Sequence, residues 1–353
     1  MRLNRFRPVL QGLGADAVLI SQPENRRYLS GFTGSAAWLV ITAERAVLAT
    51  DFRYYEQMQS EAPAFELAKV TTKFADLLPG LLSELGVERL GFESQFVTVD
   101  DLHEWSRVTP ALEWVPLKQT VETLRAVKDE AEIDAMRRSA AITDAALAHL
   151  LTVLKPGMTE REAAWEIEAY MHTHGASKIA FDLIVAAGPN GALPHARPSD
   201  RPIQAGEPVV IDIGCVCDGY CSDLTRTVCL GPASSHYLEV WQIVLRAQEA
   251  AERLLRAGTT GVEVDAAARD LIIQAGYGDQ FGHGLGHGVG LAVHEDPRAS
   301  RLSPDTFEAG MILTVEPGIY LPGEFGVRIE DMVVIRQEGI EILSFAPKTP
   351  LVA

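Results

Sequence analysis

Short apolar runs alternate with polar segments along the first 120 residues of the chain. Residues 17–20, 37–41 and 46–50 are apolar runs of strand length, and a fourth strand signal lies at 90–92. Residues 77–85 have the pattern of a helix instead. Strands that alternate with helices predict an α/β domain in this part of the chain.

Longer amphipathic stretches dominate the remainder of the chain. Residues 129–132 open a long helix, because their acidic side chains suit the positive N-terminal end of a helix dipole. Further helices are predicted at 160–171 and 239–256.

A faint internal repeat lies in the same region. Residues 154–162 resemble residues 255–263, with Gly157 corresponding to Gly258, and each segment precedes a helix rich in Ala and Glu. Two such short matches also arise by chance. A genuine repeat predicts a domain built from two related halves, with a site between them.

The length of the chain supports a division into two domains. At 353 residues, the chain exceeds the usual size of one domain, about 150 residues. Residues 118–128 are polar and carry no strong strand pattern, so the predicted domains are 1–122 and 123–353. With 47% hydrophobic and 22% charged residues, the composition allows a sizeable core.

The net charge of −17 changes the picture of possible partners. Phosphate binding needs clustered Lys and Arg, so a nucleic-acid partner is not expected, and an acidic membrane surface would repel the chain. No apolar run reaches the 18 residues of a membrane span, and the basic start lacks the apolar run of a signal peptide. We therefore expect a cytoplasmic protein.

All four cysteines lie within fifteen residues, which raises the alternative of a structural zinc site. They are Cys215, Cys217, Cys221 and Cys229, and no C-x2-C pair occurs. In a hairpin that turns at 218–219, Cys215 and Cys217 point away from the face that carries Cys221. Buried reduced thiols, as in a reducing compartment, are therefore the favoured interpretation.

Two carboxylates lie in the arms of the same predicted hairpin. Asp212 is embedded in a β-branched run, and Asp223 follows eleven residues later. In that hairpin they share a face as diagonal neighbours on adjacent strands. Two carboxylates this close repel each other and need a proton or a cation between them.

More polar residues occur in two later segments. Residues 281–295 hold three histidines among glycines, which let the backbone approach closely. Residues 313–320 and 326–330 hold one glutamate each in apolar surroundings. These residues are His283, His287, His294, Glu316 and Glu330. Each feature alone has a structural explanation, as a hydrogen-bonded buried carboxylate or a turn. Their combination in one domain favours a common site.

Four carboxylates and one imidazole are the ligands expected for a pair of divalent cations. Four negative charges balance two such ions, and oxygen-rich ligation with one histidine suits Mn²⁺ or Co²⁺. A two-metal centre can position a water molecule and polarise a carbonyl group, so hydrolysis is the predicted class of reaction.

The second part, from about Leu124 to the C-terminus, resembles the pita-bread metallopeptidase family of methionine aminopeptidase, aminopeptidase P and prolidase. The family's ligands correspond here to Asp212, Asp223, His287, Glu316 and Glu330. Residues 25–34 and 50–54 are similar to a creatinase-type N-terminal domain. The resemblance implies an α/β (α+β) fold, in which an N-terminal α/β domain precedes a pita-bread domain with pseudo-twofold related halves.

The resemblance also implies roles for the metal ligands. Asp212 would bind one metal and His287 with Glu316 the other, while Asp223 and Glu330 would bridge both. Glu316 would also act as the proton shuttle for the attacking hydroxide. The two ions would be manganese in the first place, with cobalt, zinc or iron as alternatives.

Further residues match substrate contacts of the family. His294 would contact the scissile carbonyl and stabilise the tetrahedral intermediate, while His283 and His195 would bind substrate, His283 near the proline pocket. Arg328 would hold the bridging Glu330. Arg298 lies where some prolidases carry an arginine that reads the free carboxylate of proline, although an exposed loop arginine is an equal alternative.

The resemblance leaves two activities open. Our main prediction is an Xaa-Pro aminopeptidase of the aminopeptidase P type, acting on proline-containing peptides as a homodimer. The alternative is prolidase, which splits Xaa-Pro dipeptides and would need Arg298. A non-catalytic peptide-binding protein of the same fold is a third possibility, but it predicts missing ligands, and all five are present.

Overall fold

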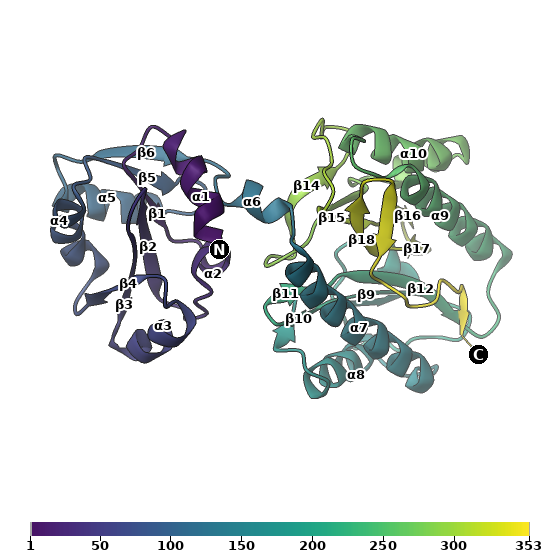
Figure 1. Cartoon of the computed structure of the whole chain (residues 1–353). Coiled ribbons are helices and arrows are strands. Elements are labelled where there is room, and N and C mark those ends of the chain that lie inside the picture. The colour runs from purple at the N-terminus through teal and green to yellow at the C-terminus, as the bar shows by residue number, and fades with distance from the viewer. Residues whose placement is uncertain (1, 353) are drawn as a thin grey trace. The chain divides into compact units, whose positions relative to one another are not determined.

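The computed structural model describes residues 2–352, and the chain divides into two compact units, Met1–Arg125 and Ala126–Ala353 (Figure 1). The division falls inside helix α6 (Glu122–Ala126), whereas the sequence placed the boundary after residue 122. No helix among residues 2–352 is long and apolar enough to span a membrane.

The first unit contains a six-stranded mixed sheet in the order β4-β3-β2-β1-β5-β6. Its strands are β1 (Ala17–Ile20), β2 (Ala37–Thr42), β3 (Ala46–Asp51), β4 (Glu66–Val70), β5 (Arg89–Glu93) and β6 (Glu113–Leu117). The helices before α6 are α1 (Arg2–Gln11), α2 (Pro23–Ser30), η1 (Phe52–Tyr54), α3 (Tyr55–Glu61), α4 (Phe74–Leu85) and α5 (Val99–Val108). The four predicted strands and the helix at 77–85 are confirmed.

The second unit contains two pairs of long helices. These are α7 (Glu130–Val153) with α8 (Glu160–Thr173), and α9 (Ser235–Leu254) with α10 (Gly261–Gln274). Buried side chains of α7 and α8 pack on β8, β9 and β12, and those of α9 and α10 pack on β15 and β18. In Figure 1 the strands of this unit lie between the two helix pairs.

The strands of the second unit form several small sheets. The first half contains β7 (Lys178–Ile179), β8 (Ile184–Ala187), η2 (Gly188–Ala192), β9 (Pro208–Ile213), β10 (Cys215–Cys217), β11 (Tyr220–Cys221) and β12 (Leu224–Leu230). The second half contains η3 (Gly278–Gln280), β13 (Gly286–Gly288), β14 (Glu295–Ala299), β15 (Ile312–Val315), β16 (Gly318–Leu321), β17 (Phe325–Arg328), β18 (Asp331–Arg336) and β19 (Gly339–Ile342). Strand β20 (Leu351–Val352) returns to pair with β12.

The two halves repeat the same local structure before α8 and α10. Gly157 and Gly258 have φ angles of 90° and 91°, and their N–H groups donate to Ile203 O and Phe307 O at 2.8 and 2.9 Å. Each glycine precedes a helix that a threonine caps with a reciprocal glutamate, in a capping box. The repeat found in the sequence is therefore structural, with two related halves.

The predicted hairpin brings the two aspartates together. Strands β10 and β11 are joined at Asp218 and Gly219, whose φ angles of 53° and 85° fit a tight turn between antiparallel strands. Further along the arms, Asp212 on β9 pairs with Thr225 on β12, so Asp223 is its diagonal neighbour. The cysteines are free, and Cys221 pairs with Val216, on the other face from Cys215 and Cys217.

Candidate metal centre

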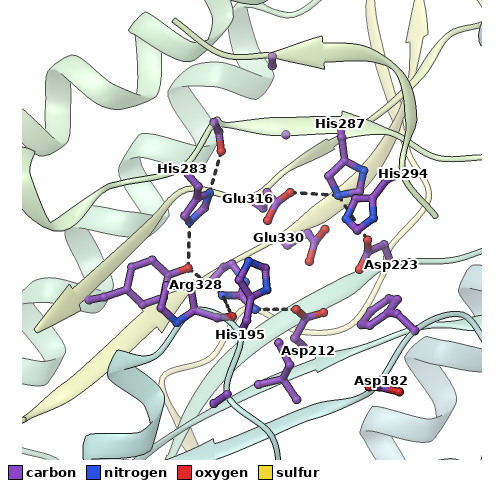
Figure 2. A pocket seen from close by; sticks show the side chains of 18 of the residues that line it. Asp182, His195, Asp212, Asp223, His283, His287, His294, Glu316, Arg328 and Glu330 are labelled. Carbon is purple, nitrogen blue, oxygen red and sulfur yellow. Dashed lines mark hydrogen bonds and ion pairs between the residues drawn. The ribbon is translucent and has the colours of Figure 1, made fainter. Parts of the chain in front are cut away.

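The five predicted ligands come from five separate places in the second unit. Asp212 lies near the end of β9, and Asp223 lies between β11 and β12. His287 is the central residue of β13, Glu316 directly follows β15, and Glu330 directly precedes β18. Figure 2 shows that all five side chains point into one pocket. Both halves therefore contribute to the same centre.

The ligand atoms lie within reach of shared cations. Carboxylate oxygens of Asp212, Asp223 and Glu330 all lie within 4.8 Å of one another. The Nε2 atom of His287 lies 3.3 Å from Glu316 Oε1 and 3.7 Å from Asp223 Oδ2. The fold thus gathers the four carboxylates and one imidazole that the sequence predicted.

Burial makes this cluster unfavourable without cations. Burial, together with the neighbouring carboxylates, raises the pKa values of Asp223 and Glu330 well above their ordinary range. Burial also raises the pKa of Glu316, and it lowers the pKa of His287, which favours a neutral imidazole. A pair of divalent cations would neutralise the carboxylates and use the lone pair of that imidazole.

Two further observations fit metal binding. The Oδ1 atom of Asp212 is buried and has no hydrogen-bond partner among the described residues. The Nδ1 atom of His287 lies 3.1 Å from Gly288 O, so Nδ1 carries the hydrogen and Nε2 is free to bind a metal. Asp212 Oδ1 and His287 Nε2 are therefore donor atoms left open for a metal.

Arg328 corrects one sequence-based assignment. Its guanidinium donates to Asp212 Oδ2 at 2.6 Å, whereas the sequence assigned it to Glu330. The link to Glu330 runs through Thr225, whose Oγ1 accepts from Arg328 Nε at 3.1 Å and donates to Glu330 Oε2 at 2.6 Å. Arg328 therefore orients one predicted metal ligand, Asp212, directly and a second one, Glu330, through Thr225.

Two threonines were missed by the sequence analysis. Besides Thr225, Thr314 Oγ1 donates to Glu316 Oε1 at 3.0 Å and accepts the backbone N–H of His287 at 3.0 Å. Each threonine lies two residues from a ligand in sequence, at Asp223-x-Thr225 and Thr314-x-Glu316. A hydroxyl two positions from a carboxylate within an apolar run was the signal that could have found them.

His283 lines the same pocket as the five predicted ligands, but its Nε2 atom is already hydrogen-bonded to another side chain. This atom is 2.9 Å from the hydroxyl of Tyr320, and Arg328 donates to the same hydroxyl at 2.7 Å. Because a guanidinium only donates, the Tyr320 proton goes to His283 Nε2, and Nδ1–H donates to Gly284 O at 2.8 Å. His283 is therefore neutral here, in agreement with the lowering of its pKa by burial.

The remaining predicted substrate residues line one cavity of about 680 Å³ that also contains the five ligands. His294 lies against His287, with ring centroids 4.3 Å apart (Figure 2). Partial burial and the nearby His287 lower the pKa of His294 to about 4. His195 and Arg298 also line the cavity, and Arg298 pairs across the strands with His287. The fold therefore brings together every site residue that the sequence named.

Comparison with known families agrees with this geometry. Residues 134–337 match the metallopeptidase family M24, and residues 2–127 match the creatinase/prolidase N-terminal domain. This chain belongs to metallopeptidase family M24. The M24 match spans all five predicted ligands, and the carboxylates of Asp212, Asp223 and Glu330 within it could hold a metal ion.

Individual relatives cover nearly the whole chain. A Xaa-Pro dipeptidase of Pyrococcus horikoshii is 38% identical over 93% of this chain and 92% of its own length. The structure of a Xaa-Pro dipeptidase from Bacillus anthracis has a TM-score of 0.97 and 39% identity, covering 100% of this chain and 99% of that one. The structure of an X-Pro aminopeptidase from Thermotoga maritima has a TM-score of 0.91 and 38% identity, and it covers 98% of this chain and 100% of that one.

Proposed function

We propose that this M24 protein is a Xaa-Pro dipeptidase, which hydrolyses the bond before a C-terminal proline. The observation that supports the proposal is that Arg298 lines the cavity with its charge unpaired among residues 2–352. Among the three guanidinium groups that line the cavity, Arg197 pairs with Asp182 and Arg328 with Asp212. Arg298 has no ion-pair partner within residues 2–352, and its fork of donors suits a substrate carboxylate.

The comparisons also support a dipeptidase over our main prediction from the sequence. Two of the three proteins compared above are named Xaa-Pro dipeptidases, and one is named an X-Pro aminopeptidase. Aminopeptidase activity on longer Xaa-Pro peptides is therefore the second candidate. We therefore replace our main prediction from the sequence, aminopeptidase P, by its alternative, prolidase.

The five ligands would hold two divalent ions, with manganese first because the site is rich in oxygen donors. When bound, these ions supply Lewis acidity and lower the pKa of a water molecule. Glu316, buried beside His287 and with a raised pKa, accepts the proton of the attacking water and passes it to the proline nitrogen. The homodimer and the cytoplasmic location remain predictions of the sequence.

The cavity residues bind and orient the dipeptide. Arg298 would bind the proline carboxylate, which places the scissile bond at a fixed distance from the centre. His294, neutral because its pKa is low, offers an N–H donor to the scissile carbonyl oxygen. His195 lines the same cavity and would contact the substrate.

The direct test compares Ala-Pro with Ala-Pro-Ala as substrates, each with Mn²⁺ and with a chelator. We expect chelator-sensitive hydrolysis of Ala-Pro and little hydrolysis of the tripeptide. Cleavage of the tripeptide alone would instead establish aminopeptidase P activity.

Arg298→Ala tests the carboxylate contact. Loss of a charge-assisted hydrogen bond of about 1.5–3 kcal/mol should raise KM for Ala-Pro about 10- to 100-fold. The matched control is Arg301→Ala, which removes an exposed arginine outside the cavity and should leave KM unchanged. An unchanged KM in Arg298→Ala would remove the argument for a dipeptidase.

A further inference from the structure

A buried ion pair lies beneath the loop that carries His294. Residues 289–294 connect β13 to β14, and Gly288 pairs with Glu295 across this hairpin. His294 lines the cavity, whereas the next side chain, that of Glu295, is only 6% exposed. Two neighbouring residues thus occupy different environments, one at the cavity and one in the interior.

The loop is folded around the Glu295 carboxylate. Its Oε2 atom accepts the N–H of Ala292 at 3.4 Å, and Gly290 lies so close that an added Cβ would collide with the carboxylate. The loop is anchored on its other side by Cys221, whose N–H donates to Gly290 O at 2.8 Å. Glu295 is therefore the internal support of this loop.

Lys128 supplies the counter-charge from a distant part of the sequence. Its Nζ atom lies 2.7 Å from Glu295 Oε1 and donates to Ala126 O at 3.2 Å, and its side chain is 1% exposed. The backbone N–H of Lys128 donates to Gly310 O at 2.9 Å, and Val127 bridges to Met311 just before β15. The ammonium group is thus held in place by its own backbone contacts.

Electrostatics makes this pair an effective anchor. A buried charge that loses its partner is strongly destabilised, so the loop cannot move Glu295 away from Lys128 at low cost. Neither Lys128 nor Glu295 is among the residues that line the cavity. The contact of Glu295 with the backbone of the loop at Ala292 gives the pair a path to His294.

We propose that Lys128 and Glu295 are positioning residues, whose buried ion pair holds the His294 imidazole at the scissile carbonyl. The inference rests on the proposed peptidase function and on the role of His294 in it. A displacement of about 1 Å at a catalytic group can lower the rate about 100-fold, so a support of the loop controls kcat without touching substrate.

The test uses the full-length manganese enzyme and Ala-Pro. We expect Lys128→Met and Glu295→Gln each to lower kcat about 10- to 100-fold, with KM and bound manganese nearly unchanged. The double variant Lys128→Met/Glu295→Gln removes both charges at similar volume and should fold even if a single variant does not. The matched control is Glu341→Gln, which breaks the ion pairs with Arg137 and Arg336 away from the cavity and should keep wild-type kcat.

A second comparison separates positioning from a general loss of structure. In a His294→Ala background, Lys128→Met should lower kcat by less than about twofold. The imidazole that the ion pair positions is already absent from this background. A loss that multiplies with that of His294→Ala would overturn the proposal. Wild-type kcat in the double variant Lys128→Met/Glu295→Gln would also overturn it.

A readout without turnover keeps the inference separate from the proposed function. In the zinc-loaded protein, the His294 ring resonance can be assigned by its loss in His294→Ala, and it should shift in Lys128→Met/Glu295→Gln but not in Glu341→Gln. An unmoved resonance would overturn the proposal, whichever peptide the enzyme cleaves. Failure of the wild-type enzyme to cleave any Xaa-Pro peptide would overturn the proposed function alone.

Discussion

Single hydroxyl and guanidinium groups decide which carboxylate oxygens face the centre. Arg328 holds Asp212 Oδ2 and leaves Oδ1 without a hydrogen-bond partner among residues 2–352, while Thr225 holds Glu330 Oε2. The Thr314 hydroxyl donates to Glu316 and so fixes its carboxylate. The same hydroxyl accepts the backbone N–H of His287 and so fixes the backbone of this histidine. Ligands that are oriented before a metal binds lose little conformational entropy on binding.

Replacement of His294 by Ala tests the role of a single side chain. Because the pKa of this imidazole is about 4, the ring is neutral at pH 7 and acts as an N–H donor. We expect kcat to fall about 10²- to 10³-fold, the usual loss for one donor to a transition state, with both metals retained. Metal analysis and kcat for Ala-Pro check this, with the exposed His172→Ala as control. Undiminished kcat would refute the role.

At the scale of elements, helix α9 carries a buried acidic group toward the C-terminal segment. Glu252 lies 3.5 Å from Lys348, and Lys348 lies 2.5 Å from Asp331, the first residue of β18. Two carboxylates thus share one ammonium group in the interior. Burial and the charge of Asp331 raise the pKa of Glu252 to about 7.

This raised pKa makes stability depend on pH in a definite direction. Between its ordinary value of 4.5 and about 7, the folded state keeps a proton that the unfolded state has lost, so stability falls as pH rises through this window. The Glu252→Gln variant has no carboxylate at this position, so its stability does not fall in this way. The Tm of the variant minus the Tm of wild type should therefore be about 5 °C larger at pH 8 than at pH 5.

Thermal unfolding at several pH values checks this expectation. Glu249→Gln is the matched control, because Glu249 lies one turn earlier on α9 and is 45% exposed. Its Tm difference from wild type measures the background effect of a Glu-to-Gln change on this helix. If the Tm difference of Glu252→Gln from wild type followed the same course with pH, the raised pKa of Glu252 would be refuted.

At the largest scale, the metal centre joins the two halves of the second unit. The first half supplies Asp212 and Asp223, and the second supplies the other three ligands. Thr225 crosses between the halves, since it bonds to Glu330 through both its side chain and its backbone carbonyl. Cations bound at this point would relieve repulsion between carboxylates that come from different halves.

Removal of the metals should therefore destabilise the fold. A ligand present at about 100 times its Kd contributes about 2.7 kcal/mol, which corresponds to roughly 5–10 °C in Tm for a domain of this size. We expect a chelator to lower the Tm of wild type by this amount. Glu330→Ala, which lacks a predicted bridging ligand, should lose both metal and activity and show no Mn²⁺-dependent shift. Full metal content in this variant would contradict the bridging assignment.

Local patterns predicted much of the fold because their causes are local. Apolar runs defined β1, β2 and β3, and a two-residue turn at Asp218 and Gly219 defined the hairpin register. That register placed Asp212 beside Asp223, and charge balance then called for cations. The sequence by itself thus predicted two domains and a ligand set, and the predicted class of reaction, hydrolysis by a metallopeptidase, agrees with the family match.

Only the tertiary structure decided which distant groups meet. Arg328 binds Asp212 instead of Glu330, and Tyr320 occupies His283 Nε2. The ion pair between Lys128 and Glu295 joins residues 167 positions apart, so no local pattern predicts it. Local propensities depend on neighbours along the chain, whereas these contacts depend on how separate strands and loops pack in space, and packing alone brings such side chains together.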